Sequence, residues 1–245
     1  MTLLTVLKHE LKGMFFVPLG WVYLFVFILL ACLLSFTTGS FYLLGEASLS
    51  YPFFRWHPLL YALLVPAVGM RTWTQEVHQG TLELLHAQPV GLGQIAIGKY
   101  LAGLLLVLLG LFLTFPMVIM VGVLGAPDYG EILSGYVGSS LVAAAFLAIS
   151  CYASARSVSS VTAYLLASAV CVMLVLLGSA QIESQLPHML PGSRTAVDLL
   201  SSLSVAPYFS SFREGVVELK ALVYFAVIVV LSLWTTVRCL KGRTA

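Results

Sequence analysis

The chain has 245 residues, of which 60% are hydrophobic and only 9% are charged, against roughly 25% charged residues in an average soluble domain. This composition excludes a water-soluble globular fold, and a formal net charge of +2 gives no indication of a nucleic-acid partner. The 4 cysteines form neither a disulfide framework nor a C-x-x-C metal motif. The sequence therefore predicts an all-α, polytopic membrane protein with one domain, residues 1–245, and no metal site.

A short basic segment precedes the first long apolar run. Residues 1–13 carry leucines at helical spacing together with Lys8 and Lys12. This pattern fits either an amphipathic helix lying at the cytoplasmic interface or simply the basic flank of the first span. The uncharged run that follows is longer than the roughly 7 to 15 apolar residues of a signal peptide, so we expect a retained membrane span.

Charged residues delimit the apolar runs that can cross a membrane. A helix rises about 1.5 Å per residue, so roughly 20 apolar residues cross a hydrocarbon core of about 30 Å. The second run is short because Arg55 and Arg71 bracket it, but both side chains can extend toward the interfaces, where Trp56 and Trp73 also fit. About six transmembrane helices are expected, at residues 16–37, 54–72, 98–122, 136–155, 160–178 and 219–237.

The placement of charge predicts the orientation of these spans. With every run crossing, most basic residues share one side and most acidic residues lie on the other. The basic side holds Lys8, Lys12, Arg71, Lys99, Arg156, Arg238, Lys241 and Arg243. The positive-inside rule then places both termini in the cytoplasm, whereas a re-entrant second run would put two basic termini in opposite compartments. The polar segment 179–218 is then extracytoplasmic, and its aromatic stretch 207–215 is typical of short helices near the interface.

Two prolines and a group of small residues bear on how the spans pack. Pro66 in the second span and Pro116 in the third each remove a helix hydrogen bond, which predicts kinks that could serve as hinges. Small residues crowd the fourth span, including Ser139, Ala143 and Ala148. They allow another helix to approach closely, either within the subunit or across a dimer interface.

The connection between the second and third spans carries the most specific pattern. Gly80 permits a turn, Thr81 suits an N-cap, Glu83 falls in the first turn of a helix, and Pro89 ends it. These positions predict a helix of about two turns over residues 82–88. A helix this short is not stable alone in water, so it needs a protein partner or the bilayer surface, and the pattern fits both.

The run from Glu76 to Leu85, EVHQGTLELL, is followed by Pro89 and by Gly98-Lys99. It resembles the E-x-x-x-G-T-x-E-x-L…P…G-K stretch of ABC type 2 exporter permeases. The later run FREGVVELKALVYF, residues 212–225, looks like the gliding-motility permease branch, to which the copper-site maturation permease of nitrous oxide reductase is related. The resemblance implies the six-helix type 2 ABC exporter permease fold over the whole chain, in a bacterial inner membrane.

In that family the short cytoplasmic helix is the coupling helix, which sits in a groove of a separate ATP-binding subunit. Carried over by position, the residues that would contact the ATP-binding subunit are Glu76, Gly80, Thr81, Leu82, Glu83 and Leu85. The resemblance implies a permease subunit with no catalytic residue and no cofactor of its own. ATP and Mg would belong to the partner, because the chain has no G-x-x-x-x-G-K-[ST] loop.

The same resemblance implies a second permease copy or a homologous permease as a further partner, within the lipid bilayer. Periplasmic or accessory proteins are additional candidate partners. The transported substrate stays open, since lipid-linked molecules, peptides, and sulfur or metal species are all handled by related permeases. A mechanical, force-transmitting role is open as well.

Three other classes of protein compete with this interpretation. An ion-coupled secondary carrier usually places acidic groups within its spans, but every Asp and Glu here lies outside them. A non-catalytic membrane scaffold explains the hydrophobicity, but not the pattern of residues 80–89. An intramembrane enzyme lacks support because there is no H-E-x-x-H motif, and His57 beside Pro58 is expected to anchor or cap the second span.

Overall fold

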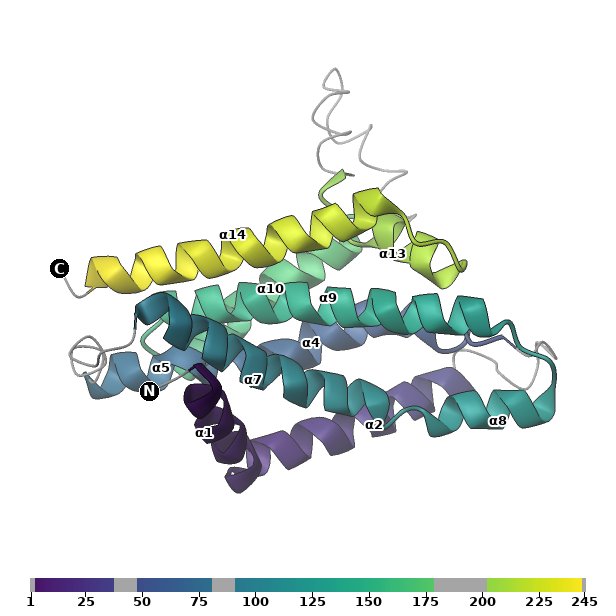
Figure 1. Ribbon diagram of the computed structural model, residues 1–245, viewed down its shortest axis with the longest axis horizontal. Helices are drawn as coiled ribbons and strands as arrows, with labels where there is room; N and C mark the ends of the chain where they lie inside the picture. Colours follow the sequence, from purple (N-terminus) through teal and green to yellow (C-terminus); the bar gives the residue numbers. More distant parts are fainter. Residues whose placement is uncertain (1–2, 38–47, 81–90, 179–201, 244–245) are drawn as a thin grey trace, which may run out of the picture.

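The computed structural model describes residues 3–37, 48–80, 91–178 and 202–243, and within these ranges the chain forms helices and no strand. Figure 1 shows an elongated bundle whose long helices run roughly along one axis. The first and the last described helix both reach the same end of this bundle, which we call the termini end.

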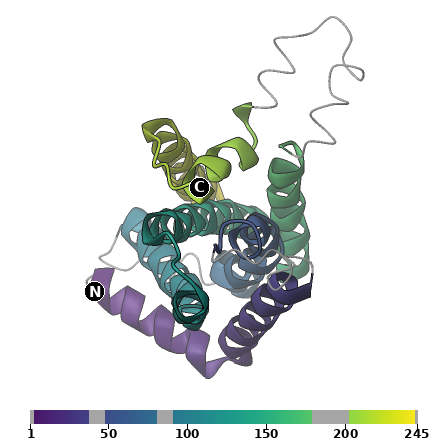
Figure 2. The ribbon, with the colours of Figure 1, turned by 90° about the vertical axis from the view of Figure 1, so that its right-hand side faces the viewer.

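The first helix lies across the bundle. α1 (Leu3–Phe16) crosses the direction of the long helices in Figures 1 and 2, and α2 (Pro18–Thr37) then follows the bundle axis. A proline at the first position of α2 fits a helix start because its missing N–H has no partner there in any case. The Trp21 indole N–H donates to the Phe15 carbonyl at 3.0 Å across this turn. The segment 1–13 is thus helical from Leu3, while its position at a membrane surface stays a prediction.

The region of the expected second span is divided between successive helical elements. A 3-10 turn, η1 (Phe54–Trp56), leads into α4 (His57–Gly69), and after Met70 the chain continues as α5 (Arg71–Gln79). The expected span, residues 54–72, covers η1, α4 and the first residues of α5, and its limits in the membrane stay a prediction. α5 ends at Gly80, which adopts φ 67°, the left-handed conformation that favours glycine at a helix C-cap. The expected turn at Gly80 is confirmed.

The two prolines behave differently. α7 (Leu92–Phe112) ends before Pro116, and this proline occupies the first position of α8 (Pro116–Leu124). The helix is therefore interrupted here, and the chain bends. Pro66 lies inside α4, and the nearby interruption falls at Met70 instead. A hinge role for either proline stays a proposal.

The remaining helices are arranged around α9 (Tyr129–Arg156). It begins at Asp128, whose carboxylate accepts from the backbone N–H of Gly130 and thereby caps the helix. α9 contacts α4, α5 and α7, as well as α10 (Ser160–Leu176), α13 (Ala206–Arg213) and α14 (Leu219–Arg243). The short helix expected within residues 207–215 is α13, which buries Phe209 and Phe212.

Small residues on α9 account for this central position. Ser139, Ala143 and Ala148 are fully buried inside the subunit, so they serve the packing of this chain. A Cβ added to Gly138 would lie 2.6 Å from the Cβ of Phe212 on α13. Such close approaches depend on the absence of a larger side chain.

His57 is fully buried within the bundle. Its Nδ1 lies 2.8 Å from the Ser139 hydroxyl, and its ring packs edge-on against Phe53 and Phe54. The expected anchoring of the second span is therefore achieved through packing against α9. The sequence could not show this because His57 and Ser139 are far apart along the chain.

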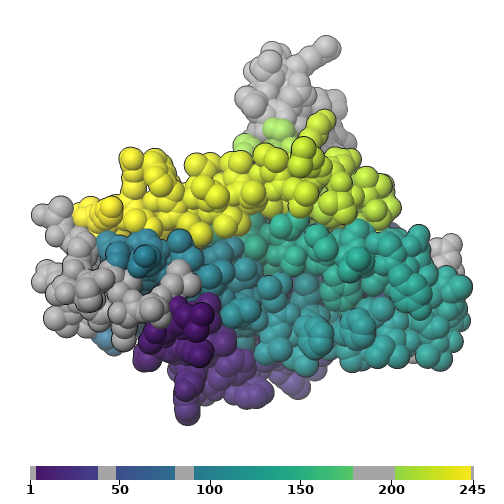
Figure 3. Space-filling model, viewed as in Figure 1, coloured from purple at the N-terminus to yellow at the C-terminus, as the bar shows by residue number. Residues whose placement is uncertain are grey.

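Within the described ranges, four helical stretches are long and apolar enough to cross a membrane: Pro18–Thr37, Leu92–Leu124, Tyr129–Arg156 and Leu219–Arg243. α10, with 17 residues, is apolar but shorter, and α4 has 13 residues. Figure 3 shows α14 along the outside of the molecule, where Val230 and Trp234 are exposed. The expected number of about six spans stays a prediction.

The packing of Gly138 gives a test of the bundle. Gly138→Ala should lower the free energy of unfolding by about 1–3 kcal/mol, because the new methyl group overlaps Phe212. Gly93→Ala is the matched control, since its Cβ would meet nothing within 4 Å and alanine favours a helix by up to about 1 kcal/mol. Thermal unfolding in detergent measures both, and equal shifts of the two variants would contradict the close α9–α13 contact.

Candidate functional site

The residues expected to contact an ATP-binding subunit belong to the segment between α5 and α7. Glu76 lies on α5 and Gly80 is the C-cap of that helix, and both are at the termini end of the bundle. Thr81, Leu82, Glu83 and Leu85, and with them the expected helix 82–88, lie outside the described residues. The described structure therefore shows how the two ends of this segment are held.

A buried ion cluster joins the helices on both sides of that segment. The ammonium group of Lys99 on α7 lies 3.0 Å from a carboxylate oxygen of Glu10 on α1 and 2.5 Å from one of Glu76 on α5. The Lys99 side chain is only 5% exposed. A buried charge is costly unless it is paired, so these two carboxylates are what allow Lys99 to lie inside the bundle. α1, α5 and α7 are thereby linked.

An aromatic ring completes this cluster. The Lys99 ammonium lies 5.3 Å from the ring centroid of Trp73, within the range of a cation–π interaction. Trp73 is itself fully buried and belongs to a small hydrophobic cluster, separate from the main core, that gathers the ends of several helices. The buried members of this cluster, which we call the end cluster, are Trp73, Leu92, Ile95, Ala96, Ala155 and Leu240. It brings α5, α7, α9 and α14 together at the termini end.

Ser154 on α9 holds the junction between α4 and α5. Its hydroxyl oxygen accepts from the backbone N–H of Trp73 at 2.9 Å and of Thr74 at 3.2 Å, and its O–H donates to the Met70 carbonyl at 2.9 Å. In an unbroken helix these N–H groups would bond to carbonyls four residues earlier. The serine side chain thus replaces helix hydrogen bonds at the interruption.

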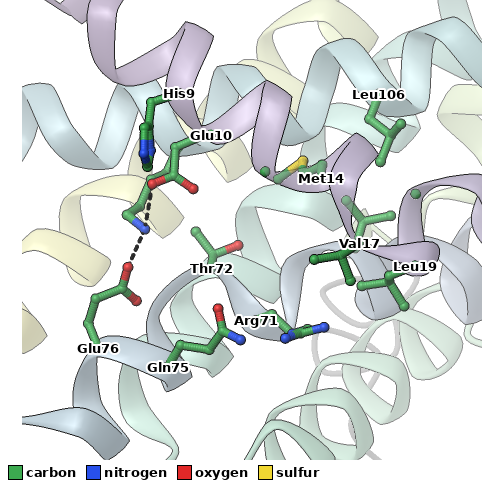
Figure 4. A pocket seen from close by; sticks show the side chains of 14 residues that line it. His9, Glu10, Met14, Val17, Leu19, Arg71, Thr72, Gln75, Glu76 and Leu106 are labelled. Carbon is green, nitrogen blue, oxygen red and sulfur yellow. Dashed lines mark hydrogen bonds and ion pairs between the residues drawn. The ribbon is translucent and has the colours of Figure 1, made fainter.

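A cavity of about 320 Å³ lies beside the ion cluster. Figure 4 shows Glu10 and Glu76 along one part of it and Val17, Leu19 and Leu106 along another. Lys99 also lines the cavity. Helices α1, α2, α4, α5 and α7 all contribute to its walls. It is open on one side, and it combines charged and apolar surfaces.

The sequence pattern had only partly indicated these residues. Lys99 was noted as the end of a G-K pair, and Glu76 as part of the loop motif. Glu10 and Ser154 were missed. The available signal for Glu10 was its place among leucines at helical spacing, which put it on a helix but not beside α7.

The described residues offer no group of 3 or more His, Cys, Asp or Glu side chains arranged for a metal ion. The 4 cysteines are free thiols, and Cys151 and Cys171 are buried among apolar side chains.

Long apolar helices, exposed apolar side chains and a basic termini end define this chain as a polytopic α-helical membrane protein. A family model described as ABC-2 family transporter protein matches residues 4–242. The chain therefore belongs to the ABC-2 family of transporter proteins and is a membrane permease component of an ABC transporter. Membership implies an ABC ATP-binding subunit as its partner. Among curated proteins no significant match was found.

The ion cluster gives a direct test of the termini end. Lys99→Met should lower the free energy of unfolding by about 3–5 kcal/mol, because it leaves two carboxylates facing each other without their shared cation. Lys8→Met, an exposed position on α1, should change it by less than about 0.5 kcal/mol.

A combined variant shows whether the loss of stability in Lys99→Met comes from lost ion pairing or from lost packing. Adding Glu10→Gln and Glu76→Gln to Lys99→Met removes the unpaired charges and should recover part of the lost stability in detergent unfolding. If the combined variant is as unstable as Lys99→Met or less stable, the ionic interpretation is wrong.

Proposed function

We propose that this chain is the permease subunit of an ATP-driven exporter, in which residues 82–88 act as a coupling helix on a separate ATP-binding subunit. Glu76, Gly80, Thr81, Leu82, Glu83 and Leu85 are the proposed contact residues. ATP and Mg are held by the partner, and a second permease copy or a homologous permease completes the pathway. Family membership and the linkage of α1, α5 and α7 by Lys99 support this proposal.

The linkage by Lys99 is the observation that carries the mechanical part of the proposal. The segment 81–90 is bounded by α5 on one side and α7 on the other, and both are bonded to the same lysine cluster. A force applied to that segment would therefore act on α1, α5 and α7 together. Packed helices of this kind change between discrete arrangements rather than deforming continuously. Closure of two ATP-binding subunits would drive such a change.

The proposed orientation has the termini end in the cytoplasm of a bacterial cell, with about six spans and an inner-membrane location. The basic residues at this end support it through the positive-inside rule. Within the family, we place the chain near the gliding-motility permease branch, on the resemblance of residues 212–225. The cargo and any periplasmic or accessory partner are left open by this proposal.

Photo-crosslinking tests the coupling helix. A photo-reactive amino acid at Leu82 should give an adduct with an ATP-binding subunit, identified by mass spectrometry, when the complex is irradiated in native membranes. The same residue at Tyr129, which is 63% exposed at the opposite end of the bundle, is the matched control and should give no such adduct. Adducts from Tyr129 alone would exclude residues 82–88 as the contact.

Cysteine labelling tests the orientation. In a variant whose native cysteines are replaced by alanine, Lys8→Cys and Gly242→Cys should react with an impermeant maleimide only in inside-out vesicles. Tyr129→Cys should react only from the outside. Reaction of Lys8→Cys and Gly242→Cys from opposite sides would mean an odd number of crossings and would overturn the six-span arrangement.

The ion-coupled carrier is the second candidate, and the two predict different energetics. A carrier transports without nucleotide hydrolysis, whereas the proposed permease copurifies with a subunit that hydrolyses ATP. A purified complex without ATPase activity would favour the carrier or a membrane scaffold.

A further inference from the structure

The cavity beside the ion cluster has two chemically different walls. Its apolar wall is formed by Met14, Val17, Leu19, Val68 and Leu106, which come from α1, α2, α4, α7 and the turn between α1 and α2. Its polar wall includes two acids, Glu10 and Glu76, and two bases, Arg71 and Lys99. A ligand that fits both walls must itself be amphiphilic.

Two basic side chains line this cavity. Lys99 is paired with two carboxylates, whereas Arg71 has no carboxylate partner among the described side chains. Both ion pairs among the described residues belong to Lys99. With the Gln75 amide oriented toward it, Arg71 donates from both Nη2 and Nε to the Gln75 oxygen, a neutral acceptor, the Nε contact being 3.2 Å. Arg71 is half-buried beside an apolar wall. A hydrogen-bonded ion pair between a guanidinium group and an anion contributes more binding free energy there than in open solvent.

The surroundings of the cavity favour an anion that belongs to a lipid. The cavity lies where the chain turns from α1, which crosses the bundle, into α2, which follows it (Figures 1 and 4). From this point onward α2 carries exposed apolar side chains, including Trp21 and Phe25. A helix lying across the end of a membrane bundle is typical of the interfacial region, at the depth of the phosphate groups of lipids.

We propose that this cavity binds the phosphate and glycerol region of a phospholipid, with Arg71 on the phosphate. The apolar wall of Met14, Val17 and Leu19 then takes the first methylene groups of the acyl chains, which leave the cavity along α2. A volume of about 320 Å³ is at the low end for small-molecule sites, which suits a headgroup and not a whole lipid. This inference does not depend on ATP-driven transport.

Gly13 provides a second way to test the cavity. It lines the cavity, and a Cβ added there meets nothing within 4 Å, so the first carbon of a new side chain is accommodated without a clash. Gly13→Phe should therefore fill the site and leave the fold intact. Gly93→Phe is the matched control, because the added Cβ there also meets nothing and Gly93 does not line the cavity.

The experiment is a titration of the full chain, purified in detergent and depleted of lipid, with phosphatidylglycerol, followed by native mass spectrometry. Arg71→Gln and Gly13→Phe should each weaken the tightest lipid-binding event roughly tenfold or more, as expected for losing a charge-assisted contact. Arg156→Gln, an exposed arginine at the same end, and Gly93→Phe should bind as the native chain does. Size-exclusion profiles confirm that all variants are folded.

Three ligands identify the chemistry that the cavity recognises. Phosphatidylethanolamine should bind like phosphatidylglycerol because both carry the phosphate. Diacylglycerol, which lacks the phosphate, and glycerol phosphate, which lacks the acyl chains, should bind at least tenfold more weakly. The proposal is overturned if diacylglycerol binds equally well, if glycerol phosphate alone occupies the site, or if Arg71→Gln retains full binding.

Discussion

Placing one lysine inside a membrane protein constrains the whole termini end of this bundle. Lys99 lies on an apolar helix, and its charge is tolerated there because Glu10 and Glu76 reach it from two other helices. The carboxylates therefore fix the position of α1 across the bundle and of α5 beside α7. The end cluster around Trp73 packs against the same helices, so that ionic and apolar contacts reinforce one another. Everything proposed about coupling and about the cavity depends on this arrangement.

The middle of the bundle follows a different rule, in which small side chains let helices approach closely. Gly138, Ser139 and Ala143 on α9 make room for α13 and α4, and His57 uses that proximity to reach the Ser139 hydroxyl. The core is therefore dense around one central helix, while α14 and α2 present apolar side chains outward. Such an outer surface is suited to lipid or to a second permease.

The sequence predicted where helices occur because apolar runs bounded by charges leave few alternatives. It predicted the turn at Gly80 because a left-handed C-cap has a strong preference for glycine. It gave no indication of the helix boundary at Met70 or of Ser154, since replacing helix hydrogen bonds by a side chain requires α9 to lie at that junction. The contact between Glu10 and Lys99 likewise depends on three helices lying side by side, which the sequence does not show. Periodicity identifies faces of helices, but it does not say which faces meet.

The interruption at Met70 has a consequence for how motion would spread. Because the Ser154 hydroxyl stands in for backbone acceptors there, α4 and α5 are separate helices that are both hydrogen-bonded to the same side chain on α9. A displacement arriving at Gly80 would then pass sideways, through the Lys99 cluster into α1 and α7 and through Ser154 into α9. The permeation pathway, wherever it lies, would then be opened by a lateral movement of helices at the termini end. A displacement along the bundle axis would not be needed.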